Sequence, residues 1–159
     1  MRIEYLADNP SFISAIAHMH HGEWGSVNSD VSLESRIADL QNHLRRKKIP
    51  MTFISLFDGI FLGSISLVAH DMDTLMHLSP WLTGLYVVQG HRSRGVGTAL
   101  VERVLLEAES IGVETLYLFT LDREYFFTRL GWFLVERTEY CGQKVIIMAL
   151  NIADRNIAA

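Results

Sequence analysis

Residues 85–100 read LYVVQGHRSRGVGTAL and decide much of the fold. An apolar run typical of a strand passes through a glycine loop into residues with helical spacing. Such a junction commonly binds phosphate, because exposed backbone N–H groups and the positive end of the helix dipole meet there. No Lys-Ser or Lys-Thr follows Gly97, which excludes a Walker loop, and no third glycine near Leu100 supports a dinucleotide fingerprint.

The rest of the chain supplies strands and helices on both sides of this loop. Asp58-Gly59 and Cys141-Gly142 are typical of hairpin turns between strands. The order of elements predicts one α/β domain over residues 1–159, with a mixed, largely antiparallel sheet flanked by helices. The predicted strands are 2–6, 52–56, 60–68, 81–88, 115–120, 132–138 and 144–150, the predicted helices are 12–19, 33–48, 95–111 and 123–130, and loops are predicted at 22–28 and 70–80.

The composition excludes several classes of protein. A chain of 159 residues with 49% hydrophobic positions has enough apolar material for one core. A net charge of −4 provides no basic field for nucleic acid. Cys141 is the only cysteine, so an intrachain disulfide and a multi-cysteine zinc site are excluded. No apolar run approaches the ~18 residues of a membrane span, and the N-terminus lacks a signal-peptide pattern. We therefore expect a cytoplasmic protein with neither nucleic acid nor membrane as partner.

The glycine loop is similar to a known family motif. Arg92-x-x-Gly95-x-Gly97, with a strand before it and a helix after it, resembles the GCN5-related N-acetyltransferase (GNAT) family. Residues 112–118 look like the next strand of that family, and residues 126–132, FFTRLGW, are similar to its Phe-Tyr-x-x-x-Gly-Phe segment. The order of elements fits from about residue 49 to residue 150. The resemblance implies a GNAT-like fold and acetyl-CoA as co-substrate.

The phosphates of coenzyme A indicate what the loop would do. Backbone N–H groups of residues 94–98 would meet the pyrophosphate, Gly95 and Gly97 would permit close approach, and Arg92 and Arg94 would add charge. Without the arginines, the glycines would equally suit a tight turn. The resemblance further implies that the strand end pairs with the pantetheine arm and polarises the thioester carbonyl. The expected cofactor-binding residues are Tyr86, Val87, Val88, Arg92, Ser93, Arg94, Gly95, Val96, Gly97 and Thr98.

The leaving thiolate needs a proton, and the residue that would supply it departs from the family pattern. Family members often carry a tyrosine four residues before the glycine of the Phe-Tyr-x-x-x-Gly segment, and that position is Phe127 here. A phenyl ring cannot donate a proton. Tyr125 is the candidate replacement, although two residues correspond to about 200° around a helix. Water is the alternative source.

The acceptor amine must lose a proton before it attacks, because an alkyl ammonium has a pKa near 10. His70 is a candidate base, since imidazole titrates near neutrality. Asp71 and Asp73 are candidates to attract a cationic acceptor, and Glu23 is a candidate base or amine ligand. His70, Asp71 and Asp73 would also suit ordinary solvated loop positions. The adjacent His20 and His21 point in different directions on a helix, so they predict no metal site.

These observations predict an acetyl-CoA-dependent N-acetyltransferase, in which an unidentified primary amine of a small molecule or peptide attacks the thioester directly. Phe127 also fits an alternative, a noncatalytic acyl-CoA-binding or regulatory module. A transferase that uses another acyl-CoA is not separated from these by sequence. The resemblance leaves a homodimer open. The basic run Arg45–Lys48 is interpreted as a solvated helix end, because its charge opposes the helix dipole.

Overall fold

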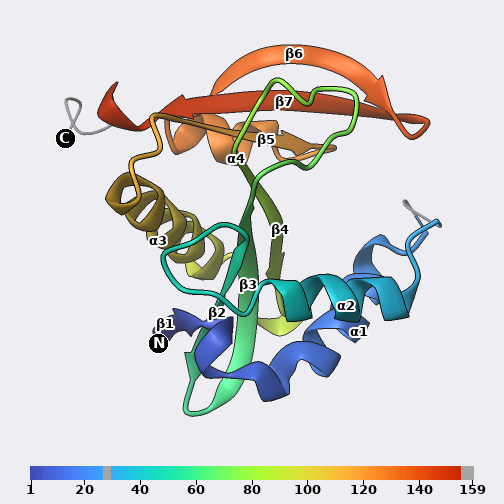
Figure 1. Cartoon of the computed structure of the whole chain (residues 1–159), viewed down its shortest axis with the longest axis vertical. Coiled ribbons are helices and arrows are strands. Elements are labelled where there is room, and N and C mark those ends of the chain that lie inside the picture. The colour runs from blue at the N-terminus through green and yellow to red at the C-terminus, as the bar shows by residue number, and fades with distance from the viewer. Residues whose placement is uncertain (27–29, 155–159) are drawn as a thin grey trace.

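Seven strands form one mixed sheet in the order β1-β2-β3-β4-β5-β7-β6 (Figure 1). The computed structural model describes residues 1–26 and 30–154. The strands are β1 (Arg2–Tyr5), β2 (Met51–Phe57), β3 (Ile60–Val68), β4 (Trp81–Val87), β5 (Thr115–Thr120), β6 (Phe133–Tyr140) and β7 (Gln143–Asn151), and the helices are α1 (Ile13–Trp24), α2 (Leu33–Asn42), α3 (Val96–Ser110) and α4 (Glu124–Arg129). Their order confirms the predicted α/β domain.

The helix ends differ from the prediction in two places. Helix α1 includes residues 22–24, which were predicted as loop, and the Gly25 N–H donates to the His21 oxygen at 2.9 Å. Val27 and Asn28 of the same predicted loop lie outside the described residues. Helix α2 ends at Asn42, because the backbone of His43 has left the helical region. The basic run Arg45–Lys48 therefore lies in the loop before β2, and its prediction as the end of a helix is wrong. Three short 3-10 turns were not predicted: Leu6–Asp8, Pro10–Phe12 and Gln89–His91.

Strands β4 and β5 pair over only a short length. These two strands are parallel and share a single register pair, Trp81 with Tyr117, whereas all other neighbouring strands are antiparallel. Beyond that pair β4 continues with β3, while β5 stays with β7 (Figure 1). The later part of β4 is therefore left without β5 as a hydrogen-bonding neighbour.

A β-bulge interrupts β4 in this same region. Ser64 of β3 pairs with Tyr86, but Ser66 pairs with Thr83, so two residues of β4 lie opposite one residue of β3. One of the two is Gly84, whose φ of 66° favours glycine. A bulge leaves backbone groups unpaired and bends the strand. The bulge thus lies within the part of β4 that does not pair with β5.

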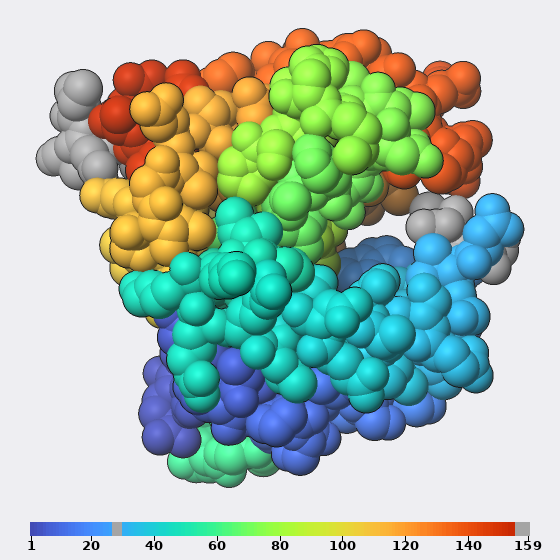
Figure 2. Space-filling view, viewed as in Figure 1, coloured from blue at the N-terminus to red at the C-terminus, as the bar shows by residue number. Residues whose placement is uncertain are grey.

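Helices cover both faces of the sheet. Helix α3 packs against one face through a cluster that includes Leu100, Val104, Phe53 and Ile65. Helices α1 and α2 cover the other face, where Ile16, Leu40 and Ile54 share a second cluster. A smaller third cluster of Met72, Trp81, Val145 and Ile147 lies between the 70–80 segment and the last hairpin. In Figure 2 the surface is hollowed between the α1–α2 half and the half that contains β6 and β7.

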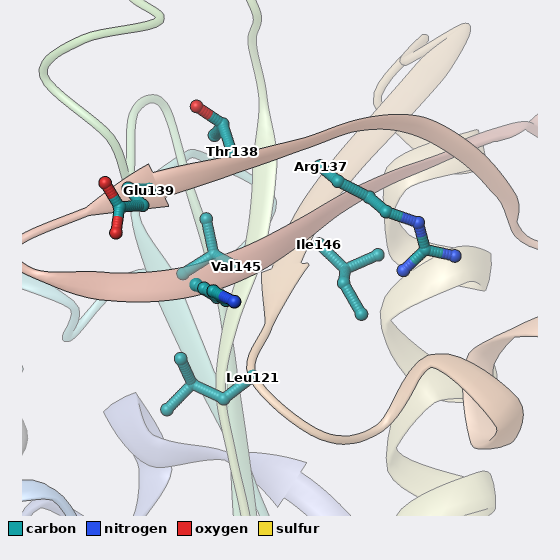
Figure 3. A pocket seen from close by; sticks show the side chains of 7 residues that line it. Leu121, Arg137, Thr138, Glu139, Val145 and Ile146 are labelled. Carbon is teal, nitrogen blue, oxygen red and sulfur yellow. The ribbon is translucent and has the colours of Figure 1, made fainter.

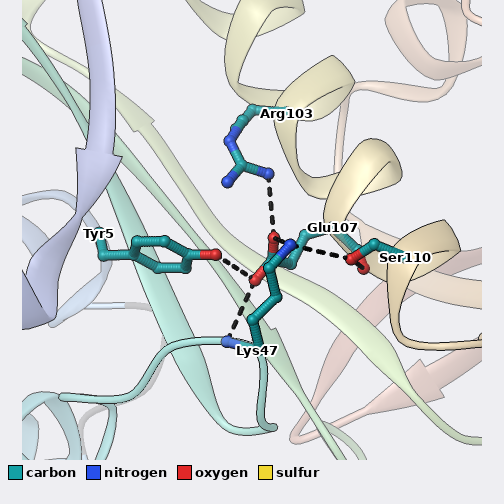
Figure 4. A network of polar contacts seen from close by, with 5 residues as sticks. All are labelled: Tyr5, Lys47, Arg103, Glu107 and Ser110. Atoms are coloured by element: carbon teal, nitrogen blue, oxygen red, sulfur yellow. Dashed lines mark hydrogen bonds and ion pairs between the residues drawn. The ribbon is translucent and has the colours of Figure 1, made fainter.

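A buried carboxylate joins three distant parts of the chain (Figure 4). The Glu107 side chain is fully buried in α3 and accepts a 2.6 Å hydrogen bond from the Tyr5 hydroxyl of β1. Lys47 donates to it from both its backbone N–H and its Nζ, each at 3.2 Å, and Arg103 donates from α3 at 3.2 Å. Within the predicted basic run, Lys47 is therefore a structural partner of Glu107.

Candidate functional site

The glycine loop leads directly into the first turn of α3. Gly95 precedes the helix with φ 85° and ψ 1°, a left-handed conformation that glycine adopts without strain. The first hydrogen bond of the helix runs from the Ala99 N–H to the Gly95 oxygen at 3.0 Å. The preceding N–H groups, those of Val96, Gly97 and Thr98, have no carbonyl within the helix to bond. The predicted anion site therefore coincides with the positive end of a 15-residue helix.

The two glycines serve different purposes. A Cβ atom added to Gly95 would meet nothing within 4 Å, so only its backbone conformation favours glycine. A Cβ atom on Gly97 would lie 3.7 Å from Cζ of Phe126 and 3.7 Å from Cγ2 of Val87. Gly97 is thus the point where α3 approaches both β4 and α4.

The two arginines of the motif lie in different surroundings. Arg92 donates from Nε to the Val87 oxygen at 2.7 Å, and its Nη2 lies 3.3 Å from Oε2 of Glu23. Its guanidinium also stands 5.6 Å from the centre of the Tyr86 ring. Arg92 therefore fastens the loop to β4 and α1, and the predicted acceptor ligand Glu23 is its ion-pair partner. Arg94, by contrast, is exposed.

Successive residues at the end of β4 direct their main-chain N–H and C=O groups to opposite sides of the strand. The Val88 N–H donates to the Leu62 oxygen of β3 at 2.8 Å. Because hydrogen-bonded and non-hydrogen-bonded pairs alternate in an antiparallel ladder, Val87 directs its main-chain groups away from β3. The 2.7 Å bond from Arg92 to the Val87 oxygen agrees with this. Of the three predicted residues Tyr86, Val87 and Val88, Val87 directs its N–H away from β3, to the side where β5 does not pair with β4.

The 70–73 segment divides into exposed and shielded residues. His70 and Asp73 are exposed, whereas Asp71 is only partly so. Burial raises the pKa of the Asp71 carboxyl to about 6, and a hydrogen bond from the Thr83 hydroxyl offsets part of the rise. Thr83 immediately precedes Gly84 of the bulge. Among the three predicted residues, Asp71 is therefore the one directed to the sheet beside the bulge.

His20 lies beside the bulge of β4, a place that sequence reasoning did not assign to it. It is 8% exposed, and its Nε2 lies 2.9 Å from Oγ of Ser64. Its ring centre lies 4.8 Å from that of Trp24 and 5.7 Å from that of Tyr86, and its Cε1 is 3.9 Å from where a Cβ on Gly84 would stand. Burial, and secondarily the charge of Arg36, lowers the pKa of His20 to about 4.

A signal for His20 was present in the sequence. Ile13, Ile16 and Ala17 are the other buried residues of α1, and His20 continues their spacing of three and four residues. The apolar stripe therefore indicates that His20 faces inward, next to the bulge.

Helix α4 carries Tyr125, the candidate proton donor, and two phenylalanines. Phe127 is 4% exposed and packs against Trp132 with ring centres 5.8 Å apart, so it belongs to the core. Phe126 is the ring that reaches Gly97. Tyr125 is 75% exposed, with its ring 5.7 Å from the guanidinium carbon of Arg129. The helix thus directs a phenyl ring, and not the Tyr125 hydroxyl, to the glycine loop.

A separate hollow lies on the outer strands β6 and β7 (Figure 3). Arg137, Glu139 and Ile146 contribute to its lining, together with Leu121 from the segment after β5. None of the predicted site residues lines this hollow, so it does not contribute to the site beside the bulge. Within residues 1–26 and 30–154, no three His, Cys, Asp or Glu side chains form a group that could hold a metal ion, and no helix is long and apolar enough to cross a membrane.

Comparison with known proteins identifies relatives of this fold. The family model described as the acetyltransferase (GNAT) family matches residues 13–132. No curated protein sequence matches the chain. Among solved structures, an aminoglycoside 6'-N-acetyltransferase complexed with coenzyme A is 19% identical, with a TM-score of 0.76 over 96% of this chain and 97% of the other.

Two further solved structures have the same arrangement of elements. A ribosomal-protein-alanine N-acetyltransferase from Brucella melitensis is 15% identical, with a TM-score of 0.71 over 95% of this chain and 99% of that one. A Salmonella typhimurium protein solved with its cofactor acetyl-CoA is 16% identical, with a TM-score of 0.69 over 96% and 94% of the two chains. At these identities the likeness establishes the fold.

Proposed function

The chain belongs to the GNAT family of acetyltransferases, with acetyl-CoA as co-substrate, and we propose that it transfers the acetyl group to a primary amine by direct attack on the thioester. Two binding regions are required, one for the cofactor phosphates and one for the amine. The start of α3 provides the first, and the surroundings of the β4 bulge provide the second.

The cofactor would lie between the glycine loop and the end of β4. The N–H groups of Val96, Gly97 and Thr98 would bind the pyrophosphate, with Arg94 adding charge from the exposed side. The Val87 N–H, directed away from β3, would bind the pantetheine arm or the thioester oxygen as negative charge develops there. Arg92 would hold these two regions at a constant distance, through its bond to the Val87 oxygen.

Asp71 is the observation that carries the proposal for the amine. At neutral pH a carboxyl group with a pKa of about 6 is mostly ionised, so it attracts an alkyl ammonium and would act as general base while the amine attacks the thioester. Its contact with Thr83 places it next to the bulge of β4, the region proposed for the thioester. The rings of Trp24 and Tyr86, 6.1 Å apart, would form an aromatic wall for a cationic acceptor.

The leaving thiolate would take its proton from water. The ring nearest to Gly97 is that of Phe126, which has no proton to donate. A thiol has a pKa near 8.5, so its thiolate is a tolerable leaving group without a general acid. The same absence of a phenol is what favours the second candidate, a noncatalytic acyl-CoA-binding module.

Calorimetric titration with acetyl-CoA, followed by thiol release with a panel of primary amines, tests the proposal. The panel should include an aminoglycoside and a peptide with a free N-terminus, because relatives of this fold are named for such substrates. We expect binding together with amine-dependent release of thiol. Binding without release from any amine would instead support the noncatalytic module.

Asp71→Asn and Asp73→Asn form a matched pair for this assay, since both remove one charge from the same segment. We expect both variants to bind acetyl-CoA, and only Asp71→Asn to lose thiol release, by about a hundredfold or more. Equal rates for the two variants would show that Asp71 takes no part in the chemistry.

A further inference from the structure

Three rings meet where the last turns of α1 pack against β3 and β4. His20 and Trp24 are four residues apart in α1, so they lie on the same face of the helix, and their ring centres are 4.8 Å apart. The ring centre of Tyr86 in β4 lies 5.7 Å from that of His20 and 6.1 Å from that of Trp24. His20 therefore contacts both rings of the proposed aromatic wall.

The imidazole of His20 is attached to β3. Its Nε2 lies 2.9 Å from Oγ of Ser64, a residue that is 0% exposed. Ser64 pairs in register with Tyr86, so these two side chains lie on the same face of the sheet, with Cβ atoms about 5 Å apart. His20 thus bridges a register pair, because it is bonded to one member and in ring contact with the other.

The cluster lies at the bulge of β4. Gly84 precedes Tyr86 by two residues, and a Cβ atom on Gly84 would stand 3.9 Å from Cε1 of His20. The bare backbone of the bulge is therefore directly beside the imidazole. Tyr86 also precedes Val87, whose N–H is proposed to meet the thioester. The three rings are accordingly next to the place proposed for the reaction.

The bond between His20 and Ser64 gives the imidazole a direction. The other buried residues of α1 are apolar, and an apolar side chain at position 20 with alanine at position 64 would leave no polar group to satisfy. A hydrogen bond differs from such packing because the ring nitrogen must face the hydroxyl oxygen. The bond therefore fixes the orientation of the ring that Trp24 and Tyr86 contact.

We propose that His20 is a positioning residue for the acceptor amine, which holds the ring of Trp24 beside that of Tyr86 so that the amine meets an aromatic wall already in place. The proposal rests on the proposed function. Trp24 is the last residue of α1 and is half-buried, so it lies outside the core clusters that hold the other two tryptophans. A wall fixed before binding favours affinity, because no side chain has to be ordered when the ammonium arrives.

The charge of the imidazole suits a cationic neighbour. Burial, and secondarily the charge of Arg36, lowers the pKa of His20 to about 4, so the ring is neutral at pH 7. A neutral ring does not repel an ammonium. It also has one nitrogen that donates and one that accepts, so a bond to Ser64 is available in either tautomer.

His43 provides a matched control. Its Nδ1 lies 2.9 Å from Oγ1 of Thr52, a 0% exposed residue of β2, so it also joins a helix end to a buried hydroxyl of the sheet. Within residues 1–26 and 30–154, no ring contact joins His43 to Trp24 or Tyr86. His43→Leu therefore removes the same kind of bond and leaves the wall intact.

The positioning role is tested with His20→Leu, Trp24→Leu, the double variant of these two, and His43→Leu. The KM for a primary amine that the unaltered protein acetylates is measured at saturating acetyl-CoA, and the Kd of acetyl-CoA is measured by calorimetry. We expect His20→Leu to raise the amine KM about tenfold. Both kcat and the Kd of acetyl-CoA should stay nearly unchanged, because the loss of uniform binding changes KM alone.

The other variants show whether His20 acts through Trp24. Trp24→Leu should raise the amine KM at least as much as His20→Leu does. The double variant should not exceed Trp24→Leu, because two residues that act through one ring are not additive. His43→Leu should keep the amine KM of the unaltered protein.

The outcomes separate the positioning role from the proposed function. An unchanged amine KM in His20→Leu would overturn the positioning role alone. An equal rise in His43→Leu would also overturn it, because any loosened helix would then have the same effect, and so would effects that multiply in the double variant. Absence of thiol release from the unaltered protein with every amine would overturn the proposed function and the positioning role with it.

Thermal unfolding of each variant excludes loss of the fold as the cause. If His20→Leu does not fold, Ser64→Ala tests the same bond from the side of β3. It should raise the amine KM with the Kd of acetyl-CoA unchanged, and an amine KM equal to that of the unaltered protein would overturn the positioning role.

Discussion

Arg92 and Val87 are joined by a 2.7 Å hydrogen bond from Nε to the main-chain oxygen, which fastens the glycine loop to the last residue of β4. The ion pair of Arg92 with Glu23 adds a second attachment, to α1. Arg92 therefore holds the loop in position. Arg94 is exposed, so we expect it to contribute to phosphate binding through its positive charge. This difference can be measured.

Removal of either arginine should weaken acetyl-CoA binding, but with different dependence on salt. Arg94→Ala should raise the Kd about fivefold at low ionic strength, and the effect should shrink in 0.5 M salt, because exposed charges are screened. The effect of Arg92→Ala should persist at high salt, since it displaces the loop. Calorimetric titration at two salt concentrations checks both. An Arg94→Ala variant that binds normally at low salt would exclude Arg94 from the phosphate site.

Substitutions at the two glycines should separate backbone strain from crowding. Gly95→Ala places a side chain at φ 85°, which costs about 1 kcal/mol of stability although space is available. Gly97→Ala should be tolerated, because its Cβ would make ordinary 3.7 Å contacts with Phe126 and Val87. Gly97→Val adds branches at that junction and should weaken acetyl-CoA binding at least tenfold, by about 1.4 kcal/mol. Thermal unfolding with calorimetry distinguishes these effects, and tight binding by a folded Gly97→Val would refute the loop assignment.

A tyrosine hydroxyl introduced on α4 should lower stability at position 127 and raise kcat at position 126. Phe127→Tyr would bury a hydroxyl in the core and should lower the free energy of unfolding by about 1–3 kcal/mol. Phe126 is half-buried beside Gly97, so Phe126→Tyr should leave the free energy of unfolding almost unchanged. If the thiolate lacks a proton donor, Phe126→Tyr should raise kcat. Denaturant unfolding and thiol release measure the two quantities, and greater stability loss in Phe126→Tyr would contradict the assignment of Phe127 to the core.

The pH dependence of stability should reveal the buried Glu107. Burial alone would raise its pKa, but hydrogen bonds from Tyr5, Lys47 and Arg103 hold the pKa below the ordinary value of 4.5. Its contribution is therefore complete above about pH 4.5 and is lost as the pH falls through the pKa of the folded state. Glu107→Gln should cost about 2 kcal/mol at pH 7 and should flatten the acid limb of the stability curve. An acid limb with the same slope in both proteins would show that Glu107 is not its source.

Asp71→Asn should make the protein more stable at neutral pH, although it slows thiol release. The pKa of Asp71 in the folded state, about 6, lies above its ordinary 3.8, so folding disfavours the ionised form. That cost is absent below about pH 3.8 and grows as the pH rises to 6, where it becomes complete. The stability difference between Asp71→Asn and the unaltered protein should therefore increase over this interval. A variant that is less stable at pH 7 would indicate a structural role for the carboxylate.

The order of helices and strands could be predicted because each depends on signals close together in the chain. The apolar periodicity of β2 and β3, with Asp58-Gly59 between them, predicts a hairpin, and the two strands pair antiparallel. Gly95 and Gly97 predict an anion site, and the structure places them at the start of α3. The end of α1 was predicted too early, because Gly22 and Gly25 look like loop residues although the helix continues past Gly22.

Local sequence by itself therefore determined the elements, their order and the phosphate loop, because periodicity and glycine conformation act within a few residues. Tertiary structure alone decided which side chains share the site. The bulge at Gly84 depends on the register of β4 against β3, which no local pattern specifies. That register also places Thr83, which precedes Gly84, opposite Ser66. Asp71 acquires its raised pKa only from burial, because desolvation is a property of the folded surroundings and not of the residue.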